Sequence, residues 1–441
     1  MKRISEFEMC QEGDICEMRG RVIFRRDFGK LCFAKLYDFY GEAQISVSVE
    51  FCENIPLFKR GDFLYVKGFV TFSKRGEKTL QVQEMQILNK SHRDLPDKWC
   101  GLKDETKVQT LRYVNTIIND DVRSIFKYRF KVLRKIQEYF ENLGLQQVET
   151  PILCPVASGA AANPFVTHHD ALDVQMFLRI APELYLKRYM ATGLQGAFEI
   201  AKCFRNEGID TTHLQEFTMV EAYQSYISYE DLIQIAIGLL QAVVSVFSED
   251  LVWNGLNFND FQRISYTEFI RKYVGIEPED WFNESKLRQI AHENNINISG
   301  CKSTMAMLDK LYKKMGLCNI HQPTVIYDYY KSPLALESPE DSRLSKQFQV
   351  IICQREVIKA CLEMIDPERQ LKNFLDQIEL SKTGELDVVR IDYSYIEALE
   401  YGVPPMGGLG MGIDRIMTIL TGSASIEDII MFTQTRPQHK S

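Results

Sequence analysis

Arginine and carboxylate side chains gather in two segments of the chain, and together these residue types suit a nucleotide and a positively charged molecule. Residues 197–223 hold Arg205 and Glu207 beside a charged loop, and residues 407–420 place glycines before a helix that carries Arg415. An arginine offers a planar fork to phosphate oxygens, whereas carboxylates in one pocket repel a triphosphate unless they hold Mg²⁺ or an ammonium group. A site for a nucleotide and a cationic second molecule satisfies both signs.

The pattern around these segments predicts a domain that mixes strands and helices. Residues 122–144 repeat apolar side chains at helical spacing and end at a glycine, which predicts one long amphipathic helix. Apolar strands then alternate with helices such as 229–247 and 284–294, and residues 390–420 suggest a strand, a turn and a helix. Because this order lacks regular βαβ alternation, it argues against a doubly wound parallel sheet.

The N-terminal part has a different pattern. Residues 13–88 alternate apolar and polar side chains in five short runs separated by glycine-containing turns, as a small closed barrel requires. Residues 89–105 combine proline, glycine and charge without a sustained period, which is typical of a linker. We therefore expect a five-stranded OB-type barrel with its linker over residues 1–100, followed by a larger α+β domain over residues 101–441.

Charge and cysteine content narrow the class of protein. The net charge is −8, yet residues 1–90 carry 15 basic and 13 acidic residues, so the acidic excess lies in the remainder. The 11 cysteines include no Cys-x-x-Cys pair, which indicates a reducing compartment. The opening residues lack the apolar run of a signal peptide, and the most apolar helix is too short to span a bilayer. We expect a cytoplasmic protein with no membrane association.

Eight stretches of the sequence, in one collinear order, resemble the class II lysyl-tRNA synthetases that carry an N-terminal anticodon-binding barrel. The resemblance extends from about residue 20 to residue 437, and its stretches are LPDKWCGLKD, SGAAANPFVTHH, LRIAPELYLKR, FRNEGID, EFTMVEAY, SPLA, ALEYGVPP and GLGMGIDR. It implies a catalytic domain with an antiparallel sheet flanked by helices. It also implies lysine–tRNA ligase activity, in which ATP and Mg²⁺ convert lysine to lysyl-adenylate and the lysyl group passes to the 3′ end of tRNA(Lys). The first motif of this family builds a homodimer interface, which here implies pairing through residues 122–143 and 149–153.

The resemblance also implies which residues bind ATP. Arg205 matches the arginine that holds the α-phosphate and the substrate carboxylate, and Glu207 matches the group that binds the adenine amino group. Phe217 matches the aromatic residue that stacks on adenine, His213 lies on the loop facing the outer phosphates, and Arg415 matches the arginine at the γ-phosphate. Attack of a carboxylate on the α-phosphorus needs charge neutralisation and alignment, so Arg205 and Arg415 are the expected catalytic residues.

A second set of residues matches the lysine-binding positions of the family. Glu183 matches the group that binds the α-amino nitrogen, and Glu221 and Tyr223 match the pair at the ε-ammonium. Glu363 matches a further carboxylate there, and Lys359 occupies the position that contacts the substrate carboxylate. Acidic groups suit this task because an ammonium group taken out of water requires negative partners.

Three of the departures from the family pattern lie at the expected metal and amino-acid sites. Gln349 replaces one of two carboxylates expected to bind Mg²⁺, while Glu356 keeps the other, so we expect a weakened metal site. Lys359 stands where the family has asparagine, and Cys361 replaces an aromatic residue, which opens space beside the lysine side chain.

The barrel residues that match the anticodon-binding positions are Phe33, Gln44 and Glu84. An exposed aromatic ring stacks on an unpaired base, and amide or carboxylate groups bind base edges.

Two other functions stay open because of the departures. One is a paralogue that activates another diamino acid or modifies an acceptor other than tRNA, and the other is an RNA-binding homologue with weak catalytic activity.

Overall fold

The computed structural model describes residues 4–48, 58–96, 102, 104–159, 162–331, 335–382 and 390–434. The chain forms two compact units, one made of residues 1–126 and 431–441 and the other of residues 127–430. The predicted boundary near residue 100 and the SPL part of the SPLA stretch lie outside the described residues.

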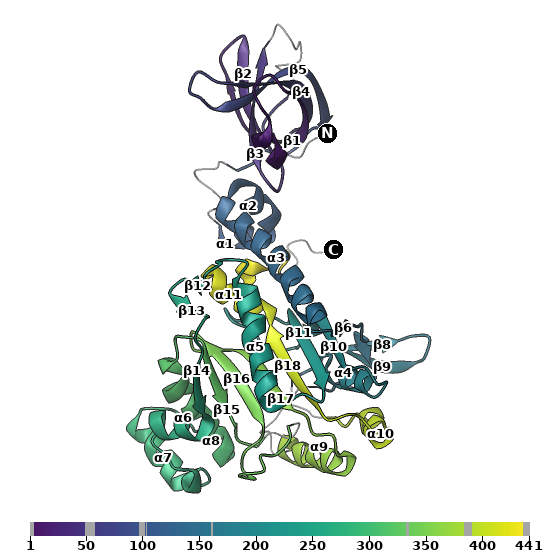
Figure 1. The fold of residues 1–441 in the computed structure, drawn as a ribbon, viewed down its shortest axis with the longest axis vertical. Helices are drawn as coiled ribbons and strands as arrows, with labels where there is room; N and C mark the ends of the chain where they lie inside the picture. The colour runs from purple at the N-terminus through teal and green to yellow at the C-terminus, as the bar shows by residue number, and fades with distance from the viewer. Residues whose placement is uncertain are drawn as a thin grey trace. The chain divides into compact units, whose positions relative to one another are not determined.

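The first unit contains a closed five-stranded barrel with the strand order β1-β2-β3-β5-β4 (Figure 1), which confirms the predicted OB-type fold. Its strands are β1 (Ile15–Asp27), β2 (Leu31–Tyr37), β3 (Glu42–Ser48), β4 (Phe63–Phe72) and β5 (Lys78–Asn89). Inward side chains such as Met18, Ala34, Ile45 and Val66 alternate with outward polar ones, because successive side chains of a strand point to opposite faces.

Short helices accompany the barrel, and one long helix follows them. They are η1 (Ile4–Met9), α1 (Glu105–Thr110), α2 (Arg112–Ile118) and α3 (Asp120–Asn142). The predicted amphipathic helix is α3, which buries Phe126, Val132, Ile136 and Phe140 on one face. The chain leaves the helix at Gly144, whose φ of 82° lies in the left-handed region that glycine adopts at low cost.

The second unit is built on an eight-stranded sheet with the order β14-β15-β16-β17-β18-β11-β10-β6. Its strands are β6 (Gln146–Gln147), β10 (Gly196–Phe204), β11 (Glu216–Ser225), β14 (Gln262–Ser265), β15 (Thr324–Tyr327), β16 (Gln347–Ile352), β17 (Arg355–Leu362) and β18 (Met406–Gly412). The six central strands are antiparallel, as predicted, but the edge strands β14 and β6 pair in parallel with their neighbours, so the whole sheet is mixed.

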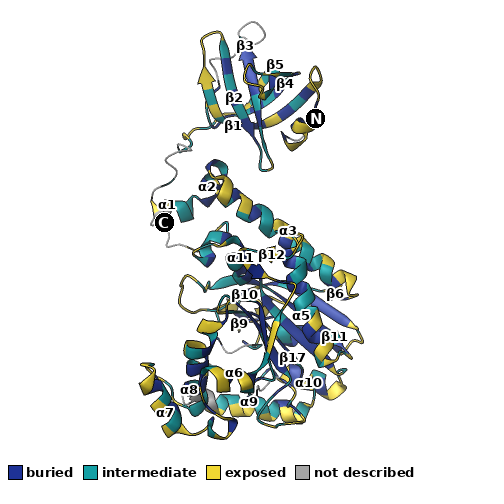
Figure 2. Ribbon diagram, turned by 60° about the vertical axis from the view of Figure 1, so that its left-hand side comes forward, coloured by how far each residue is buried: buried dark blue, intermediate teal, exposed yellow. Residues whose placement is uncertain are grey.

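Helices flank this sheet, and Figure 2 shows that its strands are largely buried while helices such as α7 carry many exposed residues. The helices are α4 (Glu183–Met190), α5 (Tyr229–Val244), α6 (Tyr266–Tyr273), α7 (Glu284–Glu293), α8 (Thr304–Leu311), α9 (Pro367–Lys382), α10 (Tyr393–Tyr401) and α11 (Ile413–Thr421). Helix α5 contacts β17 and β18, and α4 contacts β10 and β11. Among the residues that the structure describes, every helix is too short or too polar to cross a lipid bilayer.

Small elements complete the second unit. They are the sheet β7-β9-β8 (Leu153–Cys154, Val174–Leu178, Val166–His169), the hairpin β12-β13 (Val252–Trp253, Leu256–Asn257) and the single turns Pro278–Asp280, Tyr312–Gly316, Leu317–Asn319 and Ile426–Ile429.

The predicted strand in the first part of residues 390–420 is wrong, because helix α10 occupies 393–401. Asp392 begins that helix by accepting a hydrogen bond from the backbone N–H of Tyr395, and Tyr395, Ile396 and Leu399 bury one helical face.

Candidate active site

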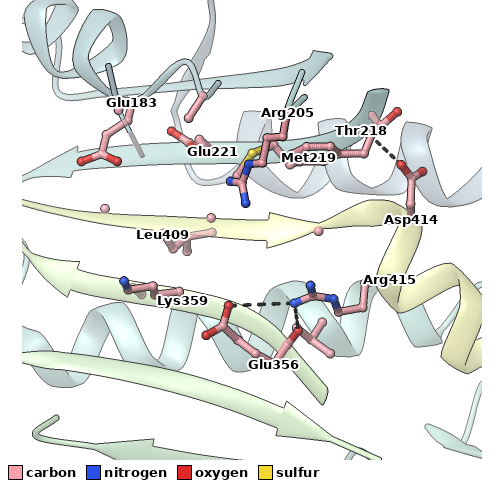
Figure 3. Close-up of a pocket in the computed structure, with 18 of the residues that line it drawn as sticks. Glu183, Arg205, Thr218, Met219, Glu221, Glu356, Lys359, Leu409, Asp414 and Arg415 are labelled. Carbon is pink, nitrogen blue, oxygen red and sulfur yellow. Dashed lines mark hydrogen bonds and ion pairs between the residues drawn. The ribbon is translucent and has the colours of Figure 1, made fainter. Parts of the chain in front are cut away.

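A cavity of about 510 Å³ lies on the central strands of the large sheet, and Figure 3 shows many of its side chains. It is lined by all eleven residues that the sequence predicted to bind ATP or lysine, with Gln349 alone among the predicted catalytic-domain residues missing from the lining. The eleven are Glu183, Arg205, Glu207, His213, Phe217, Glu221, Tyr223, Glu356, Lys359, Glu363 and Arg415. Positive and negative side chains that lie far apart in the sequence therefore share one hollow.

Strand register places Lys359 and Glu221 in one row across the cavity floor. Lys359 of β17 is opposite Gly410 of β18, and Gly410 is opposite Glu221 of β11. The Cα atoms of Lys359 and Glu221 are thus about 10 Å apart, because neighbouring strands are spaced by about 4.8 Å. A Cβ atom on Gly410 would lie 3.6 Å from Glu221 Cγ, so the glycine keeps the space between the charges open.

The next row of the sheet runs from Cys361 through Gly408 to Tyr223. A Cβ atom on Gly408 would lie 2.5 Å from Glu363 Oε1 and would overlap the ring of Tyr223. The backbone of β18 therefore forms the floor at this end of the cavity, and a larger residue would displace two predicted lysine-binding side chains.

Three carboxylates line the end of the cavity that the sequence assigned to lysine. Glu183 is the first residue of α4, Glu221 lies on β11, and Glu363 follows β17. Glu221 accepts a hydrogen bond of 3.3 Å from the hydroxyl of Tyr223, and Glu363 Oε1 accepts one of 3.5 Å from the thiol of Cys361.

Lys187 is a charged residue of this region that sequence reasoning missed. Its ammonium lies 2.7 Å from Glu183 Oε1 and 2.6 Å from Glu363 Oε2, and its side chain is 1% exposed. It also lies 5.8 Å from the centre of the Tyr223 ring. The only sequence signal was its spacing of four residues from Glu183, which on a helix is more often an exposed ion pair.

Burial is the largest single influence on the pKa values of the buried charged residues at this end of the cavity. Burial raises the pKa of Glu221 to about 8, the charge of Glu183 adds to this rise, and Lys187 opposes it. Burial also raises the pKa of Glu363. For Lys187 burial acts to lower the pKa, but the carboxylates of Glu183 and Glu363 outweigh it and hold the pKa well above its ordinary value.

Two arginines point into the other end of the cavity (Figure 3). Arg205 follows β10, and its guanidinium carbon lies 5.0 Å from the centre of the Phe217 ring. Arg415 is the third residue of α11 and donates a hydrogen bond of 2.6 Å to the backbone carbonyl of Glu356. Its guanidinium is also 3.9 Å from Glu356 Oε1. Burial lowers the pKa of Arg415 from its very high ordinary value, which leaves a desolvated positive charge for an anion.

A buried ion pair supports the start of α11 beneath Arg415. Asp414 accepts a hydrogen bond of 2.6 Å from the backbone N–H of Thr218 and lies 2.7 Å from Arg129 of α3. Asp414 and Arg129 could not be singled out from the sequence, because the contact joins three separate elements. Their contacts hold α3, β11 and α11 together at the arginine end of the cavity.

The loop between β10 and β11 is ordered by its own hydrogen bonds. Asp210 accepts hydrogen bonds from the hydroxyl and N–H of Thr212, and these bonds, with His213, hold its pKa below the ordinary value. His213 Nδ1 lies 3.0 Å from Asp210. Gln215 donates a hydrogen bond of 2.8 Å to the carbonyl of Glu207. The loop thus keeps His213 and Glu207 at the cavity wall.

Gln349, a predicted metal ligand, is placed differently from Glu356. It lies opposite Lys359 in the register of β16 and β17, and its amide oxygen accepts a hydrogen bond of 2.8 Å from the hydroxyl of Tyr329. Glu356 lines the cavity, whereas Gln349 does not. Within the described ranges, no group of three or more His, Cys, Asp or Glu residues is arranged to hold a metal ion.

The three predicted anticodon-binding residues lie on three strands of the barrel. Phe33 of β2 projects from the half-buried outer face and packs edge-on against Phe28 at 6.1 Å between ring centres. Gln44 of the adjacent β3 donates a hydrogen bond of 2.8 Å to Thr79. Glu84 of β5 is exposed and pairs in register with Lys67. Phe33 and Gln44 are thus near neighbours, while Glu84 lies farther along the strands.

Comparison with known proteins identifies relatives of both units. Residues 104–436 match a family described as tRNA synthetases class II (D, K and N), and residues 17–88 match an OB-fold nucleic acid binding domain. Lysine–tRNA ligases from Syntrophomonas wolfei, Pelotomaculum thermopropionicum and Thermotoga maritima are 36%, 38% and 37% identical to this chain. The matches cover 97%, 95% and 98% of this chain and 89%, 86% and 89% of the respective relatives.

Proposed function

The chain belongs to the class II tRNA synthetases, and from this premise we propose that it is a lysine–tRNA ligase. It activates lysine with ATP to lysyl-adenylate and pyrophosphate, and then transfers the lysyl group to the 3′ end of tRNA(Lys). The observation that carries the proposal is one cavity that is lined both by Arg205 and Arg415 and by the carboxyl groups of Glu183, Glu221 and Glu363. This combination of charges suits a polyphosphate beside an amino acid with a cationic side chain.

At the arginine end, Arg205 binds the α-phosphate and the lysine carboxylate, and Arg415 binds the γ-phosphate. Their charges stabilise the transition state as the carboxylate attacks the α-phosphorus, so the step needs no nucleophile from the protein. Phe217, which already stacks under Arg205, provides a flat face for adenine, while Glu207 binds its amino group. His213 faces the outer phosphates from its ordered loop.

At the acidic end, Glu183 binds the α-ammonium group and Glu221 with Tyr223 binds the ε-ammonium group. Glu363 supplies a second negative charge to the ε-ammonium. Lys359, which lies in the same row of the sheet as Glu221, attracts the lysine carboxylate. This assignment is supported by the burial of Glu221 and Glu363, because a buried carboxylate selects a cation over a neutral side chain.

Glu356 is the residue that fits Mg²⁺. Mg²⁺ is commonly held by one or two carboxylates together with substrate phosphates, and Glu356 lines the cavity beside Arg415. Gln349 offers only a neutral oxygen that already accepts from Tyr329, so its contribution is weak. When bound, Mg²⁺ neutralises phosphate charge.

The barrel reads the anticodon through Phe33, Gln44 and Glu84, with residues 1–100 for RNA binding and 101–441 for catalysis. We further propose a homodimer that pairs through residues 122–143 and 149–153, and a cytoplasmic location, where tRNA charging takes place. A sedimentation experiment at micromolar concentration tests the dimer, and a monomer would contradict it.

The decisive experiment measures lysine-dependent exchange of pyrophosphate into ATP, followed by charging of tRNA(Lys). A lysine–tRNA ligase shows both activities. Exchange without charging points instead to a paralogue that serves another acceptor, and exchange with a different diamino acid points to altered specificity. Absence of exchange with every amino acid points to an RNA-binding homologue.

A further inference from the structure

The acidic end of the cavity already contains an ammonium group, that of Lys187. The two ion pairs of Lys187 are not remote from the substrate site. Both of its partners, Glu183 and Glu363, line the cavity where the substrate is proposed to bind. Lys187 itself does not line it. It therefore touches two substrate-binding groups from behind.

The position of Lys187 follows from helix geometry. Glu183 is the first residue of α4, and Lys187 lies one turn later on the same face, so its side chain runs back along the helix toward Glu183. The same ammonium reaches Glu363 on the neighbouring sheet. Lys187 thus joins the start of a helix to the end of β17 through two ion pairs.

Each carboxylate keeps an oxygen that Lys187 does not contact. Lys187 approaches Glu363 through Oε2, while Glu363 Oε1 faces the floor at Gly408 and accepts from Cys361. At Glu183 the ammonium contacts Oε1, and Figure 3 shows the carboxylate directed toward the strands of the floor.

We propose that Lys187 is a positioning residue for amino-acid recognition, which fixes the carboxylates of Glu183 and Glu363 so that their other oxygens face the substrate. The inference rests on the proposed function. A fixed positive charge between two carboxylates offsets their mutual repulsion, which otherwise pushes them apart or favours their protonation. Because the Lys187 ammonium is buried and paired with both carboxylates, it holds this geometry before lysine arrives, and the substrate ammonium groups need not assemble it.

The first test is the variant K187M, which keeps the volume of the side chain and removes its charge. Removing one partner of a buried ion pair leaves the others uncompensated, so we expect the KM for lysine to rise by about 100-fold. Pyrophosphate exchange should show kcat and the KM for ATP changed by less than about threefold, since loss of lysine binding that is equal in the ground state and the transition state leaves them unaltered.

A matched control is K313M, which removes an exposed lysine whose ion pair with Asp309 also spans four helical residues at 2.7 Å. It lies outside the cavity lining and should leave the lysine KM unchanged. A similar rise in both variants would overturn the proposal.

The second test is chemical rescue of K187A. Alanine deletes three carbons and the ammonium, which together correspond to n-propylammonium, and the vacated space adjoins two cavity-lining carboxylates. We expect millimolar n-propylammonium to lower the lysine KM of K187A by at least about tenfold, whereas 1-propanol of similar size but no charge should have no effect. In the parent protein the same amine should only compete weakly with lysine.

The outcomes separate this inference from the proposed function. Absence of lysine-dependent exchange in the parent protein contradicts the proposed function, whereas exchange in the parent with an unaltered lysine KM in K187M contradicts only the role of Lys187. If kcat and both KM values in K187M change together, and the amine fails to rescue K187A, then Lys187 supports the fold and does not position substrate groups. If K187A does not fold, K187M compared with K187R decides, because only retained charge should retain a low lysine KM.

Discussion

Glu221 and Lys359 share one row of the sheet with Gly410 between them, so a carboxyl group and an ammonium group flank a glycine. A molecule that lies over this glycine meets a carboxyl group at one end and an ammonium group at the other. A free amino acid with a terminal ammonium group carries the complementary charges. Under the proposed function, strand register would therefore orient lysine as well as make room for it.

The two glycines of the floor should differ in their tolerance of a side chain. In G408A the new methyl group would meet Tyr223 and Glu363, so lysine-dependent exchange should fall by at least about 100-fold. In G410A the nearest atom, Met219 Cε, lies at 3.3 Å and belongs to a flexible side chain, so the loss should stay within about tenfold. Equal losses in both variants would show that substrate does not occupy the end of the cavity at Gly408.

The raised pKa of Glu221 predicts a pH-dependent affinity for lysine. Below pH 8 the free protein holds Glu221 largely protonated, so binding an ammonium group there must release a proton. Affinity measured by calorimetry should therefore rise between pH 6 and 8 and level off above, with proton release detectable in buffers of different ionisation enthalpy. E221Q should bind lysine weakly and without this pH dependence.

The same residue should affect stability in the opposite direction. A carboxyl whose pKa is higher in the folded than in the unfolded state contributes stability below pH 4.5, and this contribution is lost as the pH rises toward 8. The difference in unfolding free energy between E221Q and the parent should grow in favour of E221Q across that range, by at most about 1.4 kcal/mol per pH unit. Urea denaturation at several pH values measures it, and a constant difference would contradict the raised pKa.

Restoring a carboxylate at position 349 should alter the metal dependence. We expect Q349E to reach half of its maximal exchange rate at a Mg²⁺ concentration about tenfold lower than the parent, because a second anionic ligand strengthens the site. The control Q349M removes the amide oxygen without adding charge and should not lower that concentration. An unchanged Mg²⁺ dependence in Q349E would remove position 349 from the metal site.

The aromatic ring on the barrel should matter for tRNA and not for activation. F33A should raise the KM for tRNA(Lys) by about 10- to 100-fold, since stacking on a base contributes about 1–3 kcal/mol. Pyrophosphate exchange, which needs no tRNA, should be unchanged. F28A serves as the matched control, because Phe28 packs edge-on against Phe33 without occupying a predicted anticodon-binding position. A comparable loss in both variants would point to the local packing of the pair.

The sequence was sufficient to predict the barrel and eleven of the residues that line the cavity. Period-two alternation with glycine turns marks strands such as β2 and β4 because each has one buried face. These cavity residues could be identified from the sequence because they lie in compact motifs. The edge strands β6 and β14 were not, since strands of two and four residues carry no measurable period.

Lys187 and Gln349 show why the rest could not be predicted. The role of Lys187 depends on Glu363, a distant residue that the sheet brings beside α4. Gln349 is on a strand of the site, but a hydrogen bond from Tyr329 engages its amide oxygen. Both outcomes depend on tertiary contacts that residue type and spacing do not encode.

The glycine floor has a consequence for how this site diversifies. At Gly408 and Gly410 the backbone alone forms the cavity surface. A substitution there adds a side chain that takes up cavity volume, so it cannot introduce a new recognition group without blocking the site. New amino-acid preferences must therefore arise on the strand alongside, at Lys359 and Cys361, which face those glycines in register. Both positions are among those where the resemblance implies a departure from the family pattern, so we expect any altered amino-acid preference of this chain to depend on them.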